Sequence, residues 1–211
     1  MIVKVCGMRD AENIREVESA IANSSLFTLH SSLFLMGFIF WPKSSRYVSE
    51  KPTYLPTKCK RVGVFVDEEI EVVKKIAQEY ALDYIQLHGN ETPDYSALLK
   101  GHKLIKAFNI ATAEDFEQTK PYEGIVDYFL FDTKGKSVGG NGEKFDWSVL
   151  DDYHGPTPFI LSGGIGPDDA ARIRSFHHPQ LAGIDLNSRF EISPALKDIN
   201  KLKEFIKEIQ L

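Results

Sequence analysis

Short runs of apolar, mostly β-branched or aromatic residues recur along the chain, and each is followed by a polar or amphipathic stretch. The eight runs cover residues 2–6 (IVKVC), 33–40 (LFLMGFIF), 61–66 (RVGVFV), 83–88 (DYIQLH), 103–108 (KLIKAF), 127–132 (DYFLFD), 158–163 (PFILSG) and 182–186 (AGIDL). Strands that are apolar almost throughout and alternate with helices indicate a parallel sheet with a covered outer face. Eight such units in 211 residues predict an α/β fold, a single (β/α)8 TIM barrel over residues 1–211, with an open doubly wound sheet as the alternative.

The polar stretches predict helices, of which the last is the clearest. From Ala195 to Ile209 apolar residues recur every three or four positions with lysines and glutamates opposite, which predicts a helix packed outside the barrel. Further helices are predicted over 10–20, 68–80, 93–100, 112–119 and 167–175. The second βα unit is irregular, because Pro52 and Pro56 predict a loop over residues 49–60.

Charge and cysteine content narrow the classes of partner and compartment. The formal net charge is −5 at pH 7, whereas nucleic-acid binding needs clustered Lys and Arg, so we expect a small-molecule substrate and no nucleic acid. The most apolar stretch, 26–41, is shorter than the roughly 18 apolar residues of a membrane span and predicts a buried strand instead. Two cysteines without a disulfide framework, and no secretory signal pattern, favour the cytoplasm.

Polar residues end several of the apolar runs. In a (β/α)8 barrel the carboxyl ends of the strands form the face that carries the chemistry. The residues at or just beyond these ends are Cys6, Arg46, Gln86, His88, Asp132 and Asp185. We therefore expect these six side chains to converge on one mouth of the barrel.

Cys6 and Asp132 are the candidates for proton transfer. A cysteine at a strand end is usually a small buried apolar residue, but helix amino termini near the mouth would favour a thiolate that can act as a base. Gly7 permits the sharp turn that follows it. Asp132 either caps its loop through backbone amides or, desolvated beside Phe129 and Phe131, keeps its proton and acts as a general acid.

Two loops suit a phosphate group. Gly163 and Gly164 follow the seventh run, and Ser188 and Arg189 follow the eighth. Barrels that take phosphorylated ligands commonly bind them with backbone amides of these two loops. A third glycine-rich segment, 139–147, predicts either a mobile active-site loop or a solvated turn.

Arg46 and His88 each allow two interpretations. Arg46 either clamps a carboxylate with two parallel hydrogen bonds or is merely solvated in its loop. His88 has no histidine or cysteine nearby in the sequence, which favours a structural role over metal ligation. We accordingly predict no metal site.

Seven motifs occur in order along nearly the whole chain: KVCGMRD, GFIFWPKSSRYV, RVGVFVDE, IQLHGNE, FDTKGKSVGGNGEKFDW, FILSGGI and DLNSRFE. Together they resemble the phosphoribosylanthranilate isomerase family of tryptophan biosynthesis. The resemblance implies an Amadori rearrangement of N-(5-phosphoribosyl)anthranilate to 1-(2-carboxyphenylamino)-1-deoxyribulose 5-phosphate. It also implies that neither cofactor nor metal is needed, and we expect a monomer or a homodimer.

The resemblance further implies a role for each matching residue. Asp132 would protonate the ribose ring oxygen, and Cys6 would remove the proton from the adjacent sugar carbon. Arg46 would bind the anthranilate carboxylate. Asp185 would lie near the sugar hydroxyls, and the phosphate contacts would come from Gly163, Gly164, Ser188 and Arg189. From their place at a strand end we also expect Gln86 and His88 to contact the substrate.

One region departs from the family pattern. Residues 22–36 separate the first helix from GFIF by a longer segment than in similar family members. The extra residues would extend the second strand, enlarge the loop before it or form an oligomer contact. Two other functions stay open: the analogous isomerase of histidine biosynthesis, which would carry an aspartate in place of Cys6, and a catalytically silent barrel that only binds phosphorylated ligands.

Overall fold

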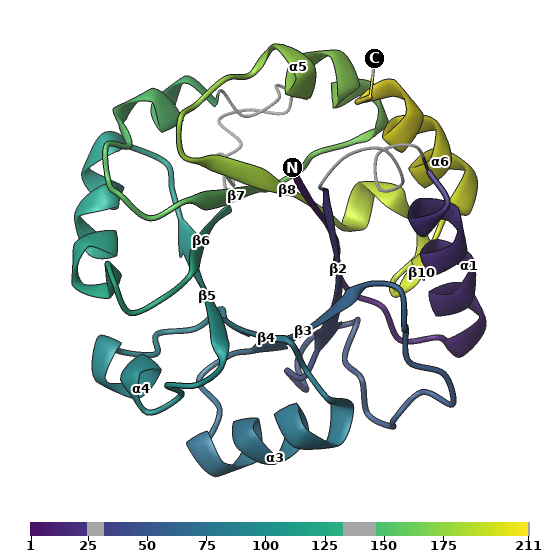
Figure 1. The fold of residues 1–211 in the computed structure, drawn as a ribbon, viewed down its shortest axis with the longest axis horizontal. Coiled ribbons are helices and arrows are strands. Elements are labelled where there is room, and N and C mark those ends of the chain that lie inside the picture. The colour runs from purple at the N-terminus through teal and green to yellow at the C-terminus, as the bar shows by residue number, and fades with distance from the viewer. Residues whose placement is uncertain (25–31, 133–146, 211) are drawn as a thin grey trace.

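The computed structural model describes residues 1–24, 32–132 and 147–210. Eight parallel strands close into a barrel in chain order, and β1 pairs with both β2 and β8 (Figure 1). The strands are β1 (Ile2–Val5), β2 (Leu33–Ile39), β3 (Lys60–Phe65), β4 (Tyr84–Leu87), β5 (Lys103–Asn109), β6 (Tyr128–Asp132), β7 (Phe159–Ser162) and β8 (Leu181–Leu186). The eight predicted strands and the TIM-barrel fold are confirmed.

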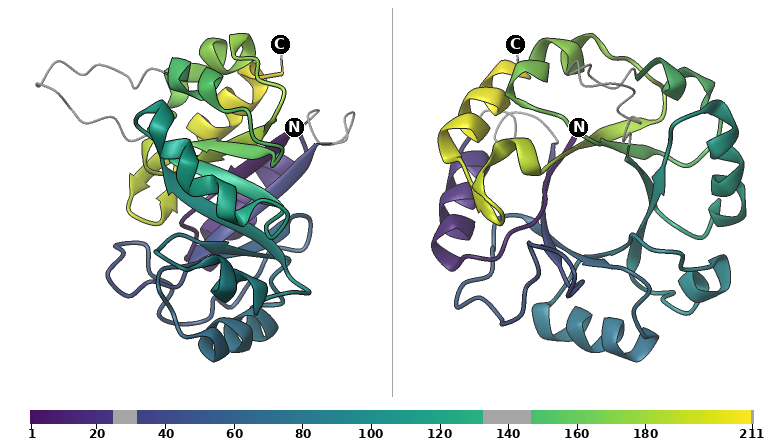
Figure 2. Two further views of the ribbon diagram at one scale, coloured as in Figure 1. Left: turned by 90° about the vertical axis from the view of Figure 1, so that its left-hand side faces the viewer. Right: turned by 180° about the vertical axis from the view of Figure 1, so that it is seen from behind.

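Helices and 3-10 helices surround the barrel (Figures 1 and 2). They are α1 (Ala11–Ala22), α3 (Ile70–Tyr80), α4 (Pro93–Ala97), η1 (Ala113–Tyr122), η2 (Trp147–Asp152), η3 (Pro167–Asp169), α5 (Ala170–Ser175), η4 (Ser188–Phe190) and α6 (Ile199–Glu208). Asp10 caps α1 at its predicted start by accepting a hydrogen bond from the Asn13 N–H at 2.8 Å. The helix predicted over 112–119 is the 3-10 helix η1, and α4 ends earlier than predicted.

The last helix is also shorter than predicted, because a hairpin precedes it. β9 (Glu191–Ser193) pairs with the antiparallel β10 (Leu196–Lys197). Between them Ala195 has a φ of 68°, which no right-handed α-helix accommodates. The Asn13 side chain exchanges hydrogen bonds of 2.8 and 3.0 Å with the backbone of Lys197 and ties the hairpin to α1. α6 packs against α1 outside the barrel, as predicted.

The second βα unit is irregular, as predicted, with no helix over residues 49–59. Glu18, buried on α1, accepts hydrogen bonds from the backbone N–H groups of Thr57 and Lys58 and from the Tyr54 hydroxyl. A single buried carboxylate thus satisfies loop amides that a helix would satisfy internally.

The longer segment over residues 22–36 contributes to the second strand. Leu33 to Met36 form the first half of β2 and pair with β1. Residues 25–31 lie outside the described residues, as do residues 139–146 of the glycine-rich segment. Within the described part of this segment, residues 33–36 belong to β2, whereas Asn23, Ser24 and Ser32 lie outside helices and strands.

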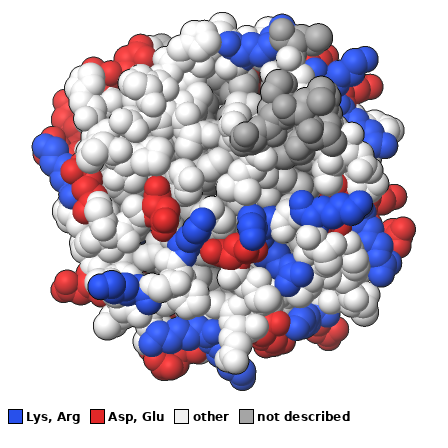
Figure 3. All heavy atoms as spheres, viewed as in Figure 1, with Lys and Arg blue, Asp and Glu red and all other residues white. Residues whose placement is uncertain are grey.

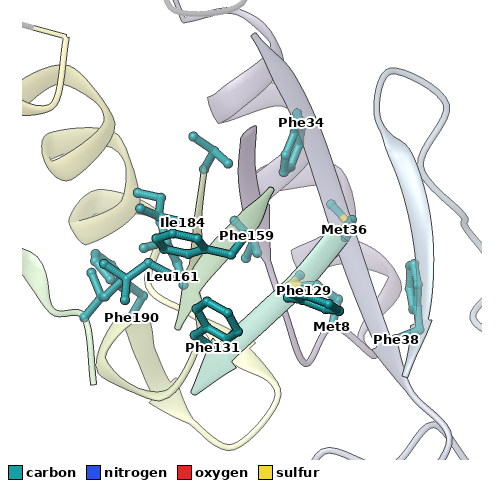
Figure 4. Close-up of a cluster of buried hydrophobic side chains, with 14 of the residues drawn as sticks. Met8, Phe34, Met36, Phe38, Phe129, Phe131, Phe159, Leu161, Ile184 and Phe190 are labelled. Carbon is teal, nitrogen blue, oxygen red and sulfur yellow. The ribbon is translucent and has the colours of Figure 1, made fainter. Parts of the chain in front are cut away.

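Alternate residues of each strand face opposite sides. The outward residues pack under the helices in the larger apolar cluster, which includes Phe34, Met36, Phe129 and Phe131 (Figure 4). The inward residues form a smaller cluster that fills the barrel: Ile2, Leu35, Val62, Tyr84, Ile105, Ala107, Leu130 and Ile160. Toward the carboxyl ends of several strands the inward positions become polar, which marks the face expected to carry the chemistry.

On the face drawn in Figure 3, the described charged side chains do not form a large patch of a single sign. Among the described residues drawn there, Lys and Arg side chains are interspersed with Asp and Glu. Among the helices of the described ranges, none is long and apolar enough to cross a membrane. Cys6 and Cys59 are both free thiols.

Candidate active site

Cys6 directly follows β1 and faces the interior of the barrel. Ile2 belongs to the interior cluster and Val5 to the outer one, so Lys4 and Cys6 continue the inward row. Cys6 is only 4% exposed. It lies against Gly37 of β2, where a Cβ atom would come within 2.8 Å of the Cys6 Sγ. The absence of a side chain at Gly37 therefore makes the space that the thiol occupies.

A buried ion pair adjoins the thiol. Lys4 is fully buried and donates a hydrogen bond to Asp185 Oδ1 at 3.0 Å. The Ser162 hydroxyl, at the end of β7, donates to Asp185 Oδ2 at 3.3 Å. Asp185 faces inward, because Ile184 and Leu186 on either side belong to the outer cluster. Both Asp185 oxygens are thus already hydrogen-bonded inside the barrel.

The electrostatic setting of Cys6 differs from the one we expected. Burial raises the pKa of the thiol above its ordinary value, Asp185 adds to the increase, and the charge and hydrogen bond of Lys4 oppose it together with the charge of Lys197. Burial lowers the pKa of Lys4, but Asp185 and Cys6 raise it, so that it ends above its ordinary value. Lysine side chains therefore favour the thiolate, but the net shift favours the thiol because Cys6 is so deeply buried.

Asp132 is the last residue of β6 and is 6% exposed. It faces inward, because Leu130 belongs to the interior cluster. The expectation that Phe129 and Phe131 desolvate it is wrong, since both rings lie on the opposite side of the strand (Figure 4). Its burial comes from the barrel interior. In barrel order β7 and β8 separate β6 from β1, so Asp132 and Cys6 reach the mouth from non-adjacent strands.

Gln86 and His88 lie near Asp132. Gln86 is a buried inward residue of β4, and its Nε2 lies 2.8 Å from His88 Nδ1. The other ring nitrogen of His88, Nε2, is 4.0 Å from Asp132 Oδ2. The structure therefore brings these three predicted residues together through a chain of polar contacts.

Arg46 extends over the turn at Gly7. Gly7 has a φ of 78°, and a Cβ atom there would come within 2.6 Å of the Arg46 Cδ, so only glycine fits this position without strain. Arg46 Nε and Nη2 donate to the Glu191 carboxylate at 2.8 and 2.5 Å. Lys197 Nζ donates to the same carboxylate at 2.6 Å. Arg46 is thus fixed by an ion pair and is not merely solvated.

Glu191 stays a carboxylate in this network. Burial raises its pKa, but the hydrogen bonds from Arg46 and Lys197 lower it further, and the net pKa lies below the ordinary value. Burial lowers the pKa of Lys197, and Glu191 only partly offsets this. The hydrogen bond to Glu191 raises the pKa of Arg46, which keeps its charge.

The two predicted phosphate loops lie against each other. Gly163 and Gly164 follow β7 with φ values of 100° and 71°, and a Cβ atom at Gly164 would meet no heavy atom within 4 Å. Ser188 and Arg189 lie in η4, just after β8. A Cβ atom at Gly166 would lie 3.5 Å from the Arg189 Cβ, so the two loops touch at the same rim of the barrel. The open space at Gly164 leaves room for an anion.

A hollow of about 280 Å³ adjoins the mouth at the ends of β4 and β5 and is lined in part by His88, Asn90 and Asn109. Within the described ranges, no group of three or more His, Cys, Asp and Glu side chains could hold a metal ion.

Sequence reasoning missed three residues of the site: Lys4, Glu191 and Lys197. Lys4 could have been found, because a lysine inside an apolar strand, two positions before Cys6, is expensive to bury. Glu191 ends the motif DLNSRFE but carries no local signal of its own. Lys197 fell within the predicted helix, where a lysine is expected to face solvent.

Comparisons with known proteins agree with this geometry. The model of the family described as N-(5'phosphoribosyl)anthranilate (PRA) isomerase matches residues 3–208. The chain is similar to N-(5'-phosphoribosyl)anthranilate isomerase of Parabacteroides distasonis, with 52% identity over 217 residues that cover 99% of this chain and 93% of that protein.

Solved structures give the same result. The chain is similar to phosphoribosyl anthranilate isomerase from Thermotoga maritima, with a TM-score of 0.78, 30% identity, and 100% of this chain and 99% of that chain covered. A structure of monomers generated from that organism's isomerase describes the parent protein as dimeric. The chain is also similar to a phosphoribosyl anthranilate isomerase in complex with reduced 1-(o-carboxyphenylamino)-1-deoxyribulose 5-phosphate, with a TM-score of 0.76, 29% identity and the same coverage.

Proposed function

Because this chain belongs to the N-(5'-phosphoribosyl)anthranilate isomerase family, we propose that Cys6 and Asp132 are the base and the acid of its reaction. The protein is an enzyme that converts N-(5'-phosphoribosyl)anthranilate to 1-(2-carboxyphenylamino)-1-deoxyribulose 5-phosphate in tryptophan biosynthesis. The family assignment decides against the histidine-pathway isomerase and the silent barrel. One observation carries the proposal for the pair: two residues able to transfer protons face inward at one mouth from non-adjacent strands.

The first step opens the ribose ring. Asp132 gives its proton to the ring oxygen while the bond between that oxygen and C1 breaks, and the nitrogen lone pair forms a C=N bond to C1. The product is a protonated Schiff base with a free hydroxyl at C4. Asp132 suits this role because it is buried at the mouth, and Nε2 of His88 lies 4.0 Å from its carboxylate.

The second step moves a proton between carbons. Cys6, as the thiolate, removes the proton from C2, and the electron pair released forms a C1=C2 double bond while the C=N electrons return to nitrogen. The enolamine then takes a proton at C1 and loses the proton of its C2 hydroxyl, which leaves the ketone at C2. No electrons leave the substrate, so the isomerisation needs no external oxidant or reductant.

The remaining predicted residues hold the substrate. We propose that Arg46, oriented by Glu191, binds the anthranilate carboxylate with donors that Glu191 leaves available, such as Nη1. The contacting loops at Gly163, Gly164, Ser188 and Arg189 would cradle the phosphate with their backbone amides.

Gln86, His88 and Asp185 would contact the sugar. Both Asp185 oxygens already accept hydrogen bonds from Lys4 and Ser162. Any bond from a sugar hydroxyl must therefore use a remaining lone pair of that carboxylate.

We also propose that residues 1–211 fold as one domain, because one barrel draws its strands from almost the whole chain. We further propose that the protein acts in the cytoplasm as a monomer or a homodimer. The dimeric isomerase of Thermotoga maritima supports the second possibility.

The test is the loss of fluorescence when the protein is added to freshly made phosphoribosylanthranilate. Wild type and Cys59→Ser should consume it at the same rate, because Cys59 lies outside the site, whereas Cys6→Ser should be slower by about a hundredfold. Cys59→Ser is the matched control for loss of a thiol. Equal rates for Cys6→Ser and Cys59→Ser would remove Cys6 from the mechanism.

A further inference from the structure

Lys4 is a charged group in the core of the barrel, and nothing in the fold requires a charge there. Its side chain has no exposed surface, and desolvating an ammonium costs several kcal/mol even after relaxation. A well-packed apolar residue in its place would often stabilise the protein equally or better. By contrast Lys106, also buried, faces outward from β5 and anchors the loop after β4 through Glu91 and the Gly89 carbonyl at 3.1 and 2.7 Å.

The geometry directs Lys4 at the thiol. Residues two apart on a strand share a face, so Lys4 and Cys6 lie on the same inward row, and the charge of Lys4 lowers the pKa of the Cys6 thiol. The pairing of β1 with β8 places Lys4 directly beside Asp185. Asp185 thereby holds the ammonium next to Cys6, and Ser162 fixes Asp185 from β7.

Four charged groups from four parts of the chain act on the thiol. They are Lys4 on β1, Asp185 on β8, Lys197 on β10 and Arg46 after β2. Lys197 and Arg46 are both engaged by Glu191. Lys4 forms an ion pair with Asp185. Among the charged groups, Lys4 lowers the pKa of Cys6 most. A thiolate at Cys6 would therefore be balanced chiefly by Lys4.

We propose that Lys4 is a positioning residue for Cys6, whose buried ammonium, held by Asp185, stabilises the thiolate that removes the sugar proton. The inference rests on the proposed function, since it takes Cys6 as the base. It goes further by naming the groups that control the charge of Cys6: Lys4 stabilises the thiolate, and Asp185 destabilises it. Variants of Lys4 and Asp185 should therefore shift the titration of Cys6 in opposite directions, which a loss of packing would not do.

The experiment titrates the Cys6 thiol in the free enzyme, in a Cys59→Ser background, by the ultraviolet absorbance of the thiolate. Lys4→Met should move the titration, and with it the acid limb of the kcat/KM profile, upward by about one to three pH units. Lys4→Arg should restore part of the shift. Asp185→Asn should move the thiol titration downward, because it removes the negative charge that opposes the thiolate.

Lys106→Met is the matched control. It also removes a buried lysine from an ion pair, so it should lower the melting temperature, yet the Cys6 titration should stay where it is in the parent. If Lys4→Met is folded and titrates like the parent, the inference is overturned. If Lys4→Met does not fold, an upward or absent shift in Asp185→Asn overturns it instead. A failure of the proposed function looks different, because Cys6→Ser would then keep its turnover while the thiol shifts persist.

Discussion

Replacing Gly37 by alanine should slow the enzyme by displacing the Cys6 thiol. The new Cβ would lie 2.8 Å from Sγ and 3.2 and 3.4 Å from the Cα and Cβ of the same residue. Non-bonded heavy atoms prefer separations of about 3.5–4.0 Å, so the Cys6 sulfur has to move away by about 0.7–1.2 Å. The Gly37 carbonyl is itself fixed by a 3.0 Å hydrogen bond from the Met8 N–H, which limits how far β2 can move instead.

The size of the effect follows from that displacement. Misplacing a reacting group by about 1 Å can cost about a hundredfold in rate, so we expect kcat to fall about 10- to 100-fold. KM should change little, because Gly37 is not among the proposed substrate contacts. Overpacking the barrel should also cost about 1–3 kcal/mol of the free energy of unfolding.

Steady-state kinetics and urea unfolding of Gly37→Ala test this reasoning. A double-mutant cycle with Cys6→Ala isolates the contact with sulfur, since the closest clash disappears with Sγ. In that background Gly37→Ala should lose less stability than in wild type, by about 0.5–3 kcal/mol. A folded Gly37→Ala enzyme with a kcat within twofold of wild type would refute the reasoning.

Three further predictions concern binding and stability. Arg46→Ala should raise KM by about 10- to 150-fold, which corresponds to the loss of a charged hydrogen bond worth about 1.5–3 kcal/mol. Arg46→Lys should recover part of the lost affinity, and Glu191→Gln should raise KM less than Arg46→Ala does. An unchanged KM in Arg46→Ala removes Arg46 from the site. Gly164→Ala and its matched control Gly124→Ala share a positive φ and open space, so both should lose about 1 kcal/mol of stability. Only Gly164→Ala should weaken inhibition by inorganic phosphate, and equal inhibition of the two variants argues against the phosphate site. Burial raises the pKa of Cys59 in the folded protein. The buried thiol therefore contributes fully to the free energy of unfolding below the ordinary thiol pKa of about 8.5, and its contribution declines as the pH rises above that value. The stability difference between wild type and Cys59→Ser in urea unfolding should therefore shrink by about 1.4 kcal/mol one pH unit above that value, and a constant difference contradicts it.

The barrel could be predicted from the sequence because its strands carry the pattern locally. Each apolar run, from 2–6 to 182–186, became a strand, since parallel strands buried on both faces leave nearly continuous apolar letters. The hairpin over 191–197 could not be predicted this way. It depends on the bonds between Asn13 and Lys197, which join residues 184 positions apart.

The same limit applies to the site. Strand ends identified Cys6 and Asp132, because the fold itself places strand ends at one mouth. The partners of these residues come from other strands and loops, so Gly37 beside the thiol and Glu191 beside Arg46 have no local signal. The sides of Phe129 and Phe131 could have been predicted, because residues one and three positions from Asp132 on the same strand face away from it.

The most direct test of the account is the steady-state turnover of Cys6→Ser and Asp132→Asn. Serine at position 6 is a far weaker base in nearly the same place, and asparagine at position 132 keeps the shape but carries no transferable proton. Each change should lower kcat by about a hundredfold or more, as expected for loss of a general base or acid, while KM stays near the wild-type value. If both variants keep more than half of the wild-type turnover, the proposed catalytic pair is wrong even though the barrel and the family stand.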